Sequence, residues 1–263
     1  MREAANSAEF RFYEELNDVL PVGRRQRSFV YAFSGQPAIK DAIEALGVPH
    51  TEVDLILVNS VSVGFDYRLQ TGDRVSVYPV FESLEIGGVT PLRPRPLREP
   101  KFVCDVHLGK LARRLRLLGF DVAYRNLATD PELVETALAE QRTLLTRDRG
   151  LLKLKQVTHG YLVRSPQVGE QVLEIIRRFD LVQRVQPFSR CTRCNGLLRP
   201  VAKAEVEEAL PPKTREYYDE FHRCAVCSQV YWKGTHFHRL AAEVRQMVAL
   251  GSDPGDRPVL TLP

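Results

Sequence analysis

The chain has 263 residues, which allows two or three small domains, and its 44% of apolar residues is ordinary for a folded protein. It contains no run of about 18 uncharged apolar residues, and its first residues lack the apolar stretch of a signal peptide. These features predict a cytoplasmic protein without membrane spans. The net charge of +4 is too small by itself to indicate a nucleic-acid partner.

Residues 1–84 carry the pattern of a small β-grasp domain. Two apolar runs predict a hairpin, a short amphipathic stretch predicts a helix that ends at Gly47, and two more runs predict further strands. The predicted strands are residues 10–13, 27–33, 55–58 and 74–80, and the predicted helix is residues 39–46. A hairpin followed by a helix and more strands indicates a ubiquitin-like β-grasp fold.

The segments ILVNSVSV and LQTGDRVSVYPV resemble the small sulfur-carrier proteins of that fold. Carrier chemistry needs a free carboxyl-terminal Gly-Gly, because the activated group is the terminal carboxylate. Here Gly87 and Gly88 are followed by most of the chain. We therefore expect an interaction module that binds a partner protein or the rest of the chain, and sulfur transfer only if the chain is cleaved after Gly88.

Residues 85–100 predict a linker, because several prolines follow two glycines and favour extended conformations. The linker and the segment after it are basic, with eight Lys or Arg against Glu99 and Asp105 between residues 91 and 120. This local excess is a candidate phosphate-binding surface. The alternative is an ordinary solvated helix face. The eight basic residues are Arg93, Arg95, Arg98, Lys101, Lys110, Arg113, Arg114 and Arg116.

Residues 101–152 predict a strand–helix–strand–helix–strand unit. The strands are residues 101–104, 121–124 and 143–146. Leucine and alanine recur at helical spacing between the first two strands, which predicts a helix that ends at Gly119 and exposes Lys110, Arg113 and Arg114. Alternating strands and helices imply a parallel sheet, whose carboxyl edge binds ligands in open α/β folds.

Acidic side chains follow two of these strands. Asp105 comes after the first strand and Asp148 after the third, and Asp130 stands at a helix start. Such a cluster would repel itself without a cation, and carboxylates suit Mg²⁺ or Mn²⁺, which activate water and steady the leaving oxygen in phosphodiester cleavage. The structural alternatives are a helix cap at Asp105, a turn at Asp148, and a cap at Asp130 with Glu132 as the substitute ligand.

Three separated motifs in this region resemble one family. The run FVCDVHLGKLARRLRLLGFDV, the later DPEL and LLTRDRGLL resemble the Mut-seven C-terminal RNase domain, a PIN-like nuclease. The resemblance implies a Mg²⁺- or Mn²⁺-dependent ribonuclease with Asp105, Asp130 and Asp148 as catalytic residues. It implies RNA as the partner, with tRNA or ribosomal RNA as candidates. The residues expected to bind RNA are Lys110, Arg113, Arg114 and Arg147.

Two Cys-x2-Cys pairs, Cys191 with Cys194 and Cys224 with Cys227, stand 29 residues apart. Each pair can present two thiolates to one tetrahedral metal, which predicts a structural Zn²⁺ in a zinc ribbon, with a small helix over residues 203–210 between the pairs. Disulfides are disfavoured in a cytoplasmic chain, and redox dithiols would need a thioredoxin-like unit. Cys104, within an apolar strand, is expected to be a core thiol.

The predicted architecture is α/β and α+β multidomain. It comprises a ubiquitin-like domain over residues 1–84, a linker over 85–100, a PIN-like nuclease core over 101–186, a zinc ribbon over 187–243 and a tail over 244–263. The predicted function is a metal-dependent ribonuclease. The alternative is a non-catalytic, zinc-dependent adaptor that binds RNA or the ribosome.

Overall fold

The computed structural model describes residues 6–80, 92 and 99–252. The predicted linker over residues 85–100 therefore lies almost wholly outside the described residues. The chain divides into two compact units. The first unit consists of Met1–Arg98 and Asp148–Leu162, and the second unit of Glu99–Arg147 and Val163–Pro263.

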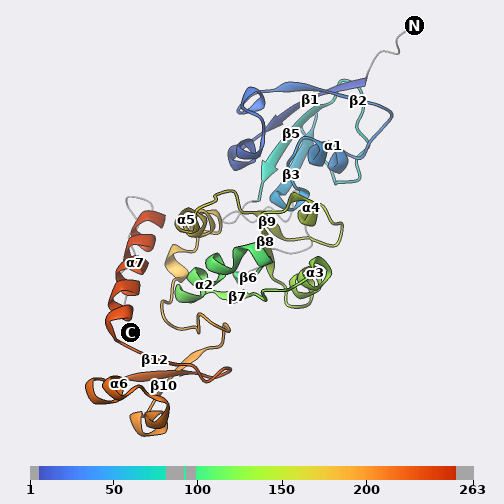
Figure 1. Cartoon of the computed structure of the whole chain (residues 1–263). Coiled ribbons are helices and arrows are strands. Elements are labelled where there is room, and N and C mark those ends of the chain that lie inside the picture. The colour runs from blue at the N-terminus through green and yellow to red at the C-terminus, as the bar shows by residue number, and fades with distance from the viewer. Residues whose placement is uncertain (1–5, 81–91, 93–98, 253–263) are drawn as a thin grey trace. The chain divides into compact units, whose positions relative to one another are not determined.

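The first unit contains a five-stranded sheet in the order β2-β1-β5-β3-β4 (Figure 1). The central strands β1 and β5 run parallel, and β1 pairs with β2 as an antiparallel hairpin. This arrangement confirms the predicted ubiquitin-like fold and adds the short strand β4, which the sequence did not indicate. The elements are β1 (Asn6–Phe12), β2 (Phe29–Phe33), α1 (Ile39–Ala45), β3 (Val53–Val58), β4 (Val61–Ser62), β5 (Arg74–Pro79) and three 3-10 turns, η1 (Glu14–Val19), η2 (Val22–Arg24) and η3 (His50–Glu52).

The core of this unit is formed by apolar side chains that alternate along β1 and recur at helical spacing in α1. Phe10 and Phe12 point to the same face of β1 and are fully buried, as are Ile39 and Ile43 of α1 and Ile56 of β3. Side chains two apart on a strand share a face, and side chains four apart on a helix share a side, so the two periods bring these residues together. The first unit also contains α4 (Arg149–Leu152) and β9 (Gly160–Leu162).

Parallel strands form the centre of the second unit. Strand β6 (Lys101–Cys104) pairs in parallel with β7 (Asp121–Ala123) on one side and with β8 (Thr143–Thr146) on the other. Helix α2 (Gly109–Leu117) packs on β7, and helix α3 (Asp130–Ala139) packs on β6 and β8. The predicted strands are confirmed to within one residue at each end.

The rest of the second unit contains longer helices and a small antiparallel sheet in the order β10-β11-β12. Helix α7 crosses the predicted boundary after residue 243. None of the described helices is long and apolar enough to cross a membrane. The elements are η4 (Val106–Leu108), α5 (Val168–Arg178), η5 (Val182–Arg184), β10 (Leu198–Val201), α6 (Pro212–Tyr217), β11 (Phe221–Cys224), β12 (Val230–Trp232) and α7 (Thr235–Gly251).

The predicted helix over residues 203–210 is wrong. Two separate 3-10 turns, η6 (Lys203–Glu205) and η7 (Glu207–Ala209), occupy this stretch. The reason is tertiary: Val206 and Leu210 are buried with Phe221 in a small core of the cysteine-containing sheet, and the backbone of Val206, at φ −123°, interrupts the helical path.

Gly119 allows the tight turn between α2 and β7. Its φ of +96° lies in the left-handed region, and a Cβ atom there would lie 2.2 Å from the carbonyl oxygen of Gln186. We predict that Gly119→Ala lowers the free energy of unfolding by more than about 1 kcal/mol, measured by urea denaturation. Gly169→Ala is the matched control, because a Cβ atom at Gly169 meets nothing within 4 Å. Equal stability of the two variants would contradict this role of Gly119.

Candidate metal centre and carboxylate site

The four cysteines of the two Cys-x2-Cys pairs come together in the second unit. Their Sγ atoms all lie within 4.8 Å of one another, with 3.6 Å between Cys191 and Cys227 and 3.3 Å between Cys194 and Cys224. A tetrahedral site with Zn–S bonds of about 2.3 Å places its sulfurs about 3.8 Å apart, and a covalent S–S bond would need about 2.05 Å. The four thiols therefore fit a zinc ion, and the cluster is consistent with the predicted zinc ribbon.

The two cysteine pairs sit in matching backbone turns. Asn195 and Ser228, each the residue after the second cysteine of its pair, have φ of 75° and 58°. Asn195 donates its amide hydrogen to the carbonyl of Cys191 at 2.9 Å, and Ser228 donates to the carbonyl of Cys224 at 3.1 Å. The amides of Val226 and Cys227 point at the sulfur of Cys224, at 3.4 and 3.5 Å. Hydrogen bonds of this kind stabilise negative charge on sulfur.

Two of the four thiols have pKa values shifted in opposite directions. Burial alone would raise the pKa of Cys191, but hydrogen bonds from the hydroxyl of Tyr231 and from backbone amides bring it down to about 7. Burial and the neighbouring thiols raise the pKa of Cys194 to about 12. Four thiolates within 4.8 Å of one another would repel each other without a cation between them, which is the condition that a bound Zn²⁺ would meet.

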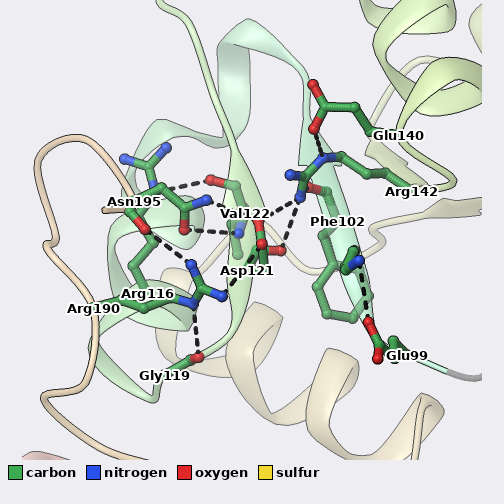
Figure 2. Close-up of polar contacts among 11 residues, drawn as sticks. Glu99, Phe102, Arg116, Gly119, Asp121, Val122, Glu140, Arg142, Arg190 and Asn195 are labelled. Carbon is green, nitrogen blue, oxygen red and sulfur yellow. Dashed lines mark hydrogen bonds and ion pairs between the residues drawn. The ribbon is translucent and has the colours of Figure 1, made fainter. Parts of the chain in front are cut away.

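Asn195 and Arg116 attach the first cysteine turn to the edge of β7 (Figure 2). The side-chain oxygen of Asn195 accepts the amide hydrogen of Val122 at 3.0 Å, and Arg116 donates to the carbonyl of Val122 at 2.9 Å. Arg116 also donates to the carbonyls of Thr192 and Arg193, at 3.3 and 3.0 Å. The backbone N–H and C=O groups of Val122, on the free edge of β7, are thus both satisfied by side chains.

An ion-pair network around Asp121 strengthens this attachment (Figure 2). Asp121 pairs with Arg142 at 2.5 Å and with Arg190 at 3.3 Å, and accepts a hydrogen bond from the side chain of Asn195 at 2.8 Å. Partial burial alone would raise the pKa of Asp121, but the bonds from Arg142 and Asn195 hold it below its usual value. Asp121 is the first residue of β7, in agreement with the predicted strand over residues 121–124.

Asp105 lies at the carboxyl end of β6, as predicted, beside the end of β8. Its side chain is buried, with the residue 3% exposed. One carboxylate oxygen accepts the amide hydrogen of His107 at 2.8 Å, and the other accepts from the amide of Arg147 at 3.1 Å and from the hydroxyl of Thr146. An ionised carboxylate offers about four acceptor positions. Most of the hydrogen-bonding capacity of Asp105 is therefore used within the fold.

Asp130 is exposed at the first position of α3 in the second unit. The predicted alternative, that Asp130 caps this helix, is wrong, because Thr129 is the N-cap and forms a capping box with Glu132. The carboxylate of Glu132 also pairs with Arg125 at 2.6 Å, and the backbone and side chain of Thr129, with Arg125, lower its pKa to about 2. Glu132 is thus engaged in structural bonds.

Asp148 is exposed in the first unit. It is the N-cap of α4, and its carboxylate accepts the amide hydrogen of Gly150 at 2.7 Å. Within the part of the chain that the structure describes, the four cysteines are the one group of three or more potential ligands that meets a metal-binding distance, and it includes none of the three aspartates. The shared metal site of Asp105, Asp130 and Asp148 stays a prediction.

The basic residues expected on α2 differ in how far they are exposed to solvent. Lys110 and Arg113 are exposed, as is Arg147 after β8. Arg114 is partly buried and forms an ion pair with Glu243 of α7. Arg116, which was counted in the basic surface, is only 3% exposed and belongs to the attachment of β7. Arg116 therefore does not belong to the basic surface, and Arg114 contributes to it only in part.

Several further side chains of the second unit contribute to its packing and hydrogen bonding. Cys104 is fully buried, and burial raises the pKa of its thiol, which confirms a core thiol. Tyr231 holds Cys191 through its hydroxyl at 3.0 Å, and Trp232 packs on the small core of the ribbon. Gln171 is buried and donates to the carbonyl of Ser165 at 2.9 Å.

The sequence patterns did not indicate the side chains that attach the first cysteine turn to β7. Asn195 carried a weak signal, since asparagine after a Cys-x2-Cys pair tolerates positive φ. Arg142 and Arg190 carried none.

The ubiquitin-like fold, the parallel α/β core and the four-cysteine cluster make this a mixed α/β multidomain protein. Comparison with protein families identifies the two parts: residues 100–244 match the Mut7-C RNAse domain, and residues 5–85 match the Mut7-C ubiquitin domain. The chain belongs to the Mut7-C RNAse domain family. No curated protein and no solved structure matched it.

The metal centre can be tested by composition. We predict about one zinc ion per chain in the purified protein and loss of most of that zinc in Cys194→Ser, because three sulfurs leave the tetrahedral site incomplete. Cys104→Ala is the matched control and keeps its zinc, since Cys104 lies outside the cluster. Elemental analysis of the dialysed proteins is the measurement. Unchanged zinc in Cys194→Ser would contradict the assignment.

The network around Asp121 can be tested by stability. Asp121→Asn leaves Arg142, whose side chain is 9% exposed, with less compensating charge. We predict that this substitution lowers the free energy of unfolding by about 1–3 kcal/mol at pH 7. This value lies below the range for a fully buried ion pair, because Asp121 is partly exposed. The pKa of Asp121 is lower in the folded state, so its contribution is present above about pH 4 and is lost as pH falls through the folded-state pKa.

Urea denaturation at pH 7 and near pH 3 measures this effect, and the difference between wild type and Asp121→Asn should shrink at the lower pH. The control is Asp219→Asn, since Asp219 pairs with Lys203 at the surface and is 86% exposed. A variant of Asp121 as stable as this control would show that the network does not hold the edge of β7.

Proposed function

We propose that this protein is a cytoplasmic, metal-dependent ribonuclease. The observation that carries the proposal is the position of Asp105, a carboxylate at the end of the central strand of a parallel sheet, inside the region that matches the Mut7-C RNAse domain. The carboxyl edge of such a sheet is the usual place for ligands and catalytic groups. The exposed side chain of Arg147 follows directly after the neighbouring strand.

Asp105, Asp130 and Asp148 are the proposed ligands for Mg²⁺ or Mn²⁺. Their oxygen donors suit hard divalent cations, and Asp130 and Asp148 are exposed. When bound, the cation would supply an activated water and neutralise charge on the leaving oxygen of the phosphodiester. The chain itself would fix the orientation of Asp105 through the amides of His107 and Arg147.

RNA is the proposed substrate, with tRNA and ribosomal RNA as candidates. The exposed basic residues Lys110, Arg113 and Arg147 would neutralise its phosphates, with Arg114 contributing less because it already pairs with Glu243. Single-stranded or looped RNA suits a small site better than a duplex, because its backbone can enter it.

A non-catalytic adaptor is the second candidate, and one observation favours it. Asp105 is buried, and its oxygens already accept three hydrogen bonds from the fold. A carboxylate used in this way can be purely structural. In that case the zinc-dependent ribbon and the basic residues would bind RNA or the ribosome without cleaving RNA.

The two functions predict different results for labelled single-stranded RNA. As a ribonuclease, the protein cuts RNA only with Mg²⁺ or Mn²⁺, and Asp105→Asn or Asp148→Asn lowers the cleavage rate on the order of 100-fold or more, while the dissociation constant for RNA stays within about twofold. Gel assays of cleavage and filter binding of RNA are the measurements. Asp148 is exposed, so its variant should keep the fold even if Asp105→Asn does not.

The control variant is Asp219→Asn, which changes an exposed aspartate outside the proposed site and should cleave RNA as wild type does. The adaptor instead predicts no cleavage by any of these proteins, equal RNA binding by all of them, and loss of binding when zinc is removed by a chelator.

A further inference from the structure

Residues Asp148–Leu162, here called the shared segment, belong to two parts of the protein at once. The segment lies inside the match to the Mut7-C RNAse domain, which spans residues 100–244. In the structure it belongs to the same compact unit as the ubiquitin-like strands. It begins with Asp148, one of the proposed metal ligands, so whatever holds the segment also bears on that carboxylate.

Glu52 holds the end of the shared segment. It lies in η3 of the ubiquitin-like fold, is 1% exposed, and accepts the amide hydrogen of Leu162 at 2.9 Å. A buried carboxylate is costly unless it is hydrogen-bonded, and a hydrogen bond to a charged group contributes more than one between neutral groups. The bond therefore fixes the position of Leu162 against η3.

His50 holds the middle of the segment. Its Nε2 atom lies 3.1 Å from the carbonyl oxygen of Val157, and its Nδ1 atom lies 2.6 Å from the carboxylate of Glu44 in α1. Both ring nitrogens thus lie within hydrogen-bonding distance of oxygen atoms. The ring is 7% exposed and packs edge-on against Phe65, which keeps it in this orientation.

A third contact lies nearer to Asp148. The ammonium group of Lys153 donates to the carbonyl oxygen of Glu44 at 3.1 Å. Leu152 and Val157 are buried, so apolar packing supports the polar contacts. The contacts of Lys153, Val157 and Leu162 all go to one short stretch of the ubiquitin-like fold, from the end of α1 to η3.

We infer that the ubiquitin-like fold is a positioning module for the nuclease, which acts by holding the shared segment, and with it Asp148, through Glu44, His50 and Glu52. This inference rests on the proposed function where it assigns a catalytic consequence. The physical contacts themselves can be tested independently of activity. Glu52 and His50 are positioning residues, because they act through the segment and do not meet the substrate.

The experiment uses the full chain and measures two quantities. Amide hydrogen exchange of the shared segment reports how firmly it is held, and steady-state cleavage of labelled RNA with Mn²⁺ gives kcat and KM. In Glu52→Ala, we expect the amide of Leu162 to exchange about tenfold faster. We expect kcat to fall severalfold with KM unchanged. Glu52→Gln keeps an acceptor oxygen and should restore both values, which a general loss of stability would not predict.

Two further variants keep the test decisive. Lys153→Met removes a contact from an exposed side chain, so it should fold even if Glu52→Ala does not, and it should raise exchange within the shared segment. Glu9→Ala is the matched control, since the side chain of Glu9 is 44% exposed and forms a surface ion pair with Arg74, so its loss should change neither quantity.

The outcomes separate this inference from the proposed function. Unchanged exchange in both Glu52→Ala and Lys153→Met would overturn it, and so would faster exchange with an unchanged kcat. If the wild-type protein does not cleave RNA at all, the proposed function fails and the catalytic part of the inference fails with it. Hydrogen exchange alone then decides whether the ubiquitin-like fold holds the segment.

Discussion

The edge of β7 is the constraint on which the second unit depends. A strand edge leaves backbone groups that must find partners, and a solvent-exposed edge invites pairing with other chains. Here the amide of Val122 donates to Asn195, and its carbonyl accepts from Arg116. Asn195 belongs to the cysteine turn, and Arg116 belongs to α2. The backbone groups at this edge therefore have both partners only when the ribbon is folded. The four-cysteine cluster and the parallel core are therefore parts of one structure.

This dependence gives the ribbon a role beyond its own fold. Its described core contains few buried apolar side chains, chiefly Val206, Leu210 and Phe221, which is small for a segment of this length. Metal binding by the four cysteines would supply the missing stability and would also fix Asn195, which directly follows Cys194. Arg116 then has its two carbonyl partners in place in the same turn.

The ubiquitin-like fold also contacts a segment that lies within the match to the Mut7-C RNAse domain. Its buried side chains Glu52 and His50 bond to backbone groups of the segment that begins with Asp148. A ubiquitin-like fold that ends in a free Gly-Gly acts through its terminus, whereas here the polar groups of η3 and α1 make the contacts. On the proposed function, these contacts would let such a fold serve a nuclease without sulfur-carrier chemistry.

The sequence by itself determined most of the strands and helices and the grouping of the four cysteines. Strands, helices and paired cysteines follow from local patterns, so β6, β8, the hairpin and the four-cysteine cluster were predicted correctly. Only the tertiary structure decided which polar side chains are used inside the fold. Arg116 carries the same charge as Arg113, yet it is buried because its position on α2 faces the cysteine turn. Arg114 pairs with Glu243, and Glu52 meets Leu162, across more than 100 residues of sequence. Periodicity and spacing report on neighbours along the chain, and they carry no information about such distant partners.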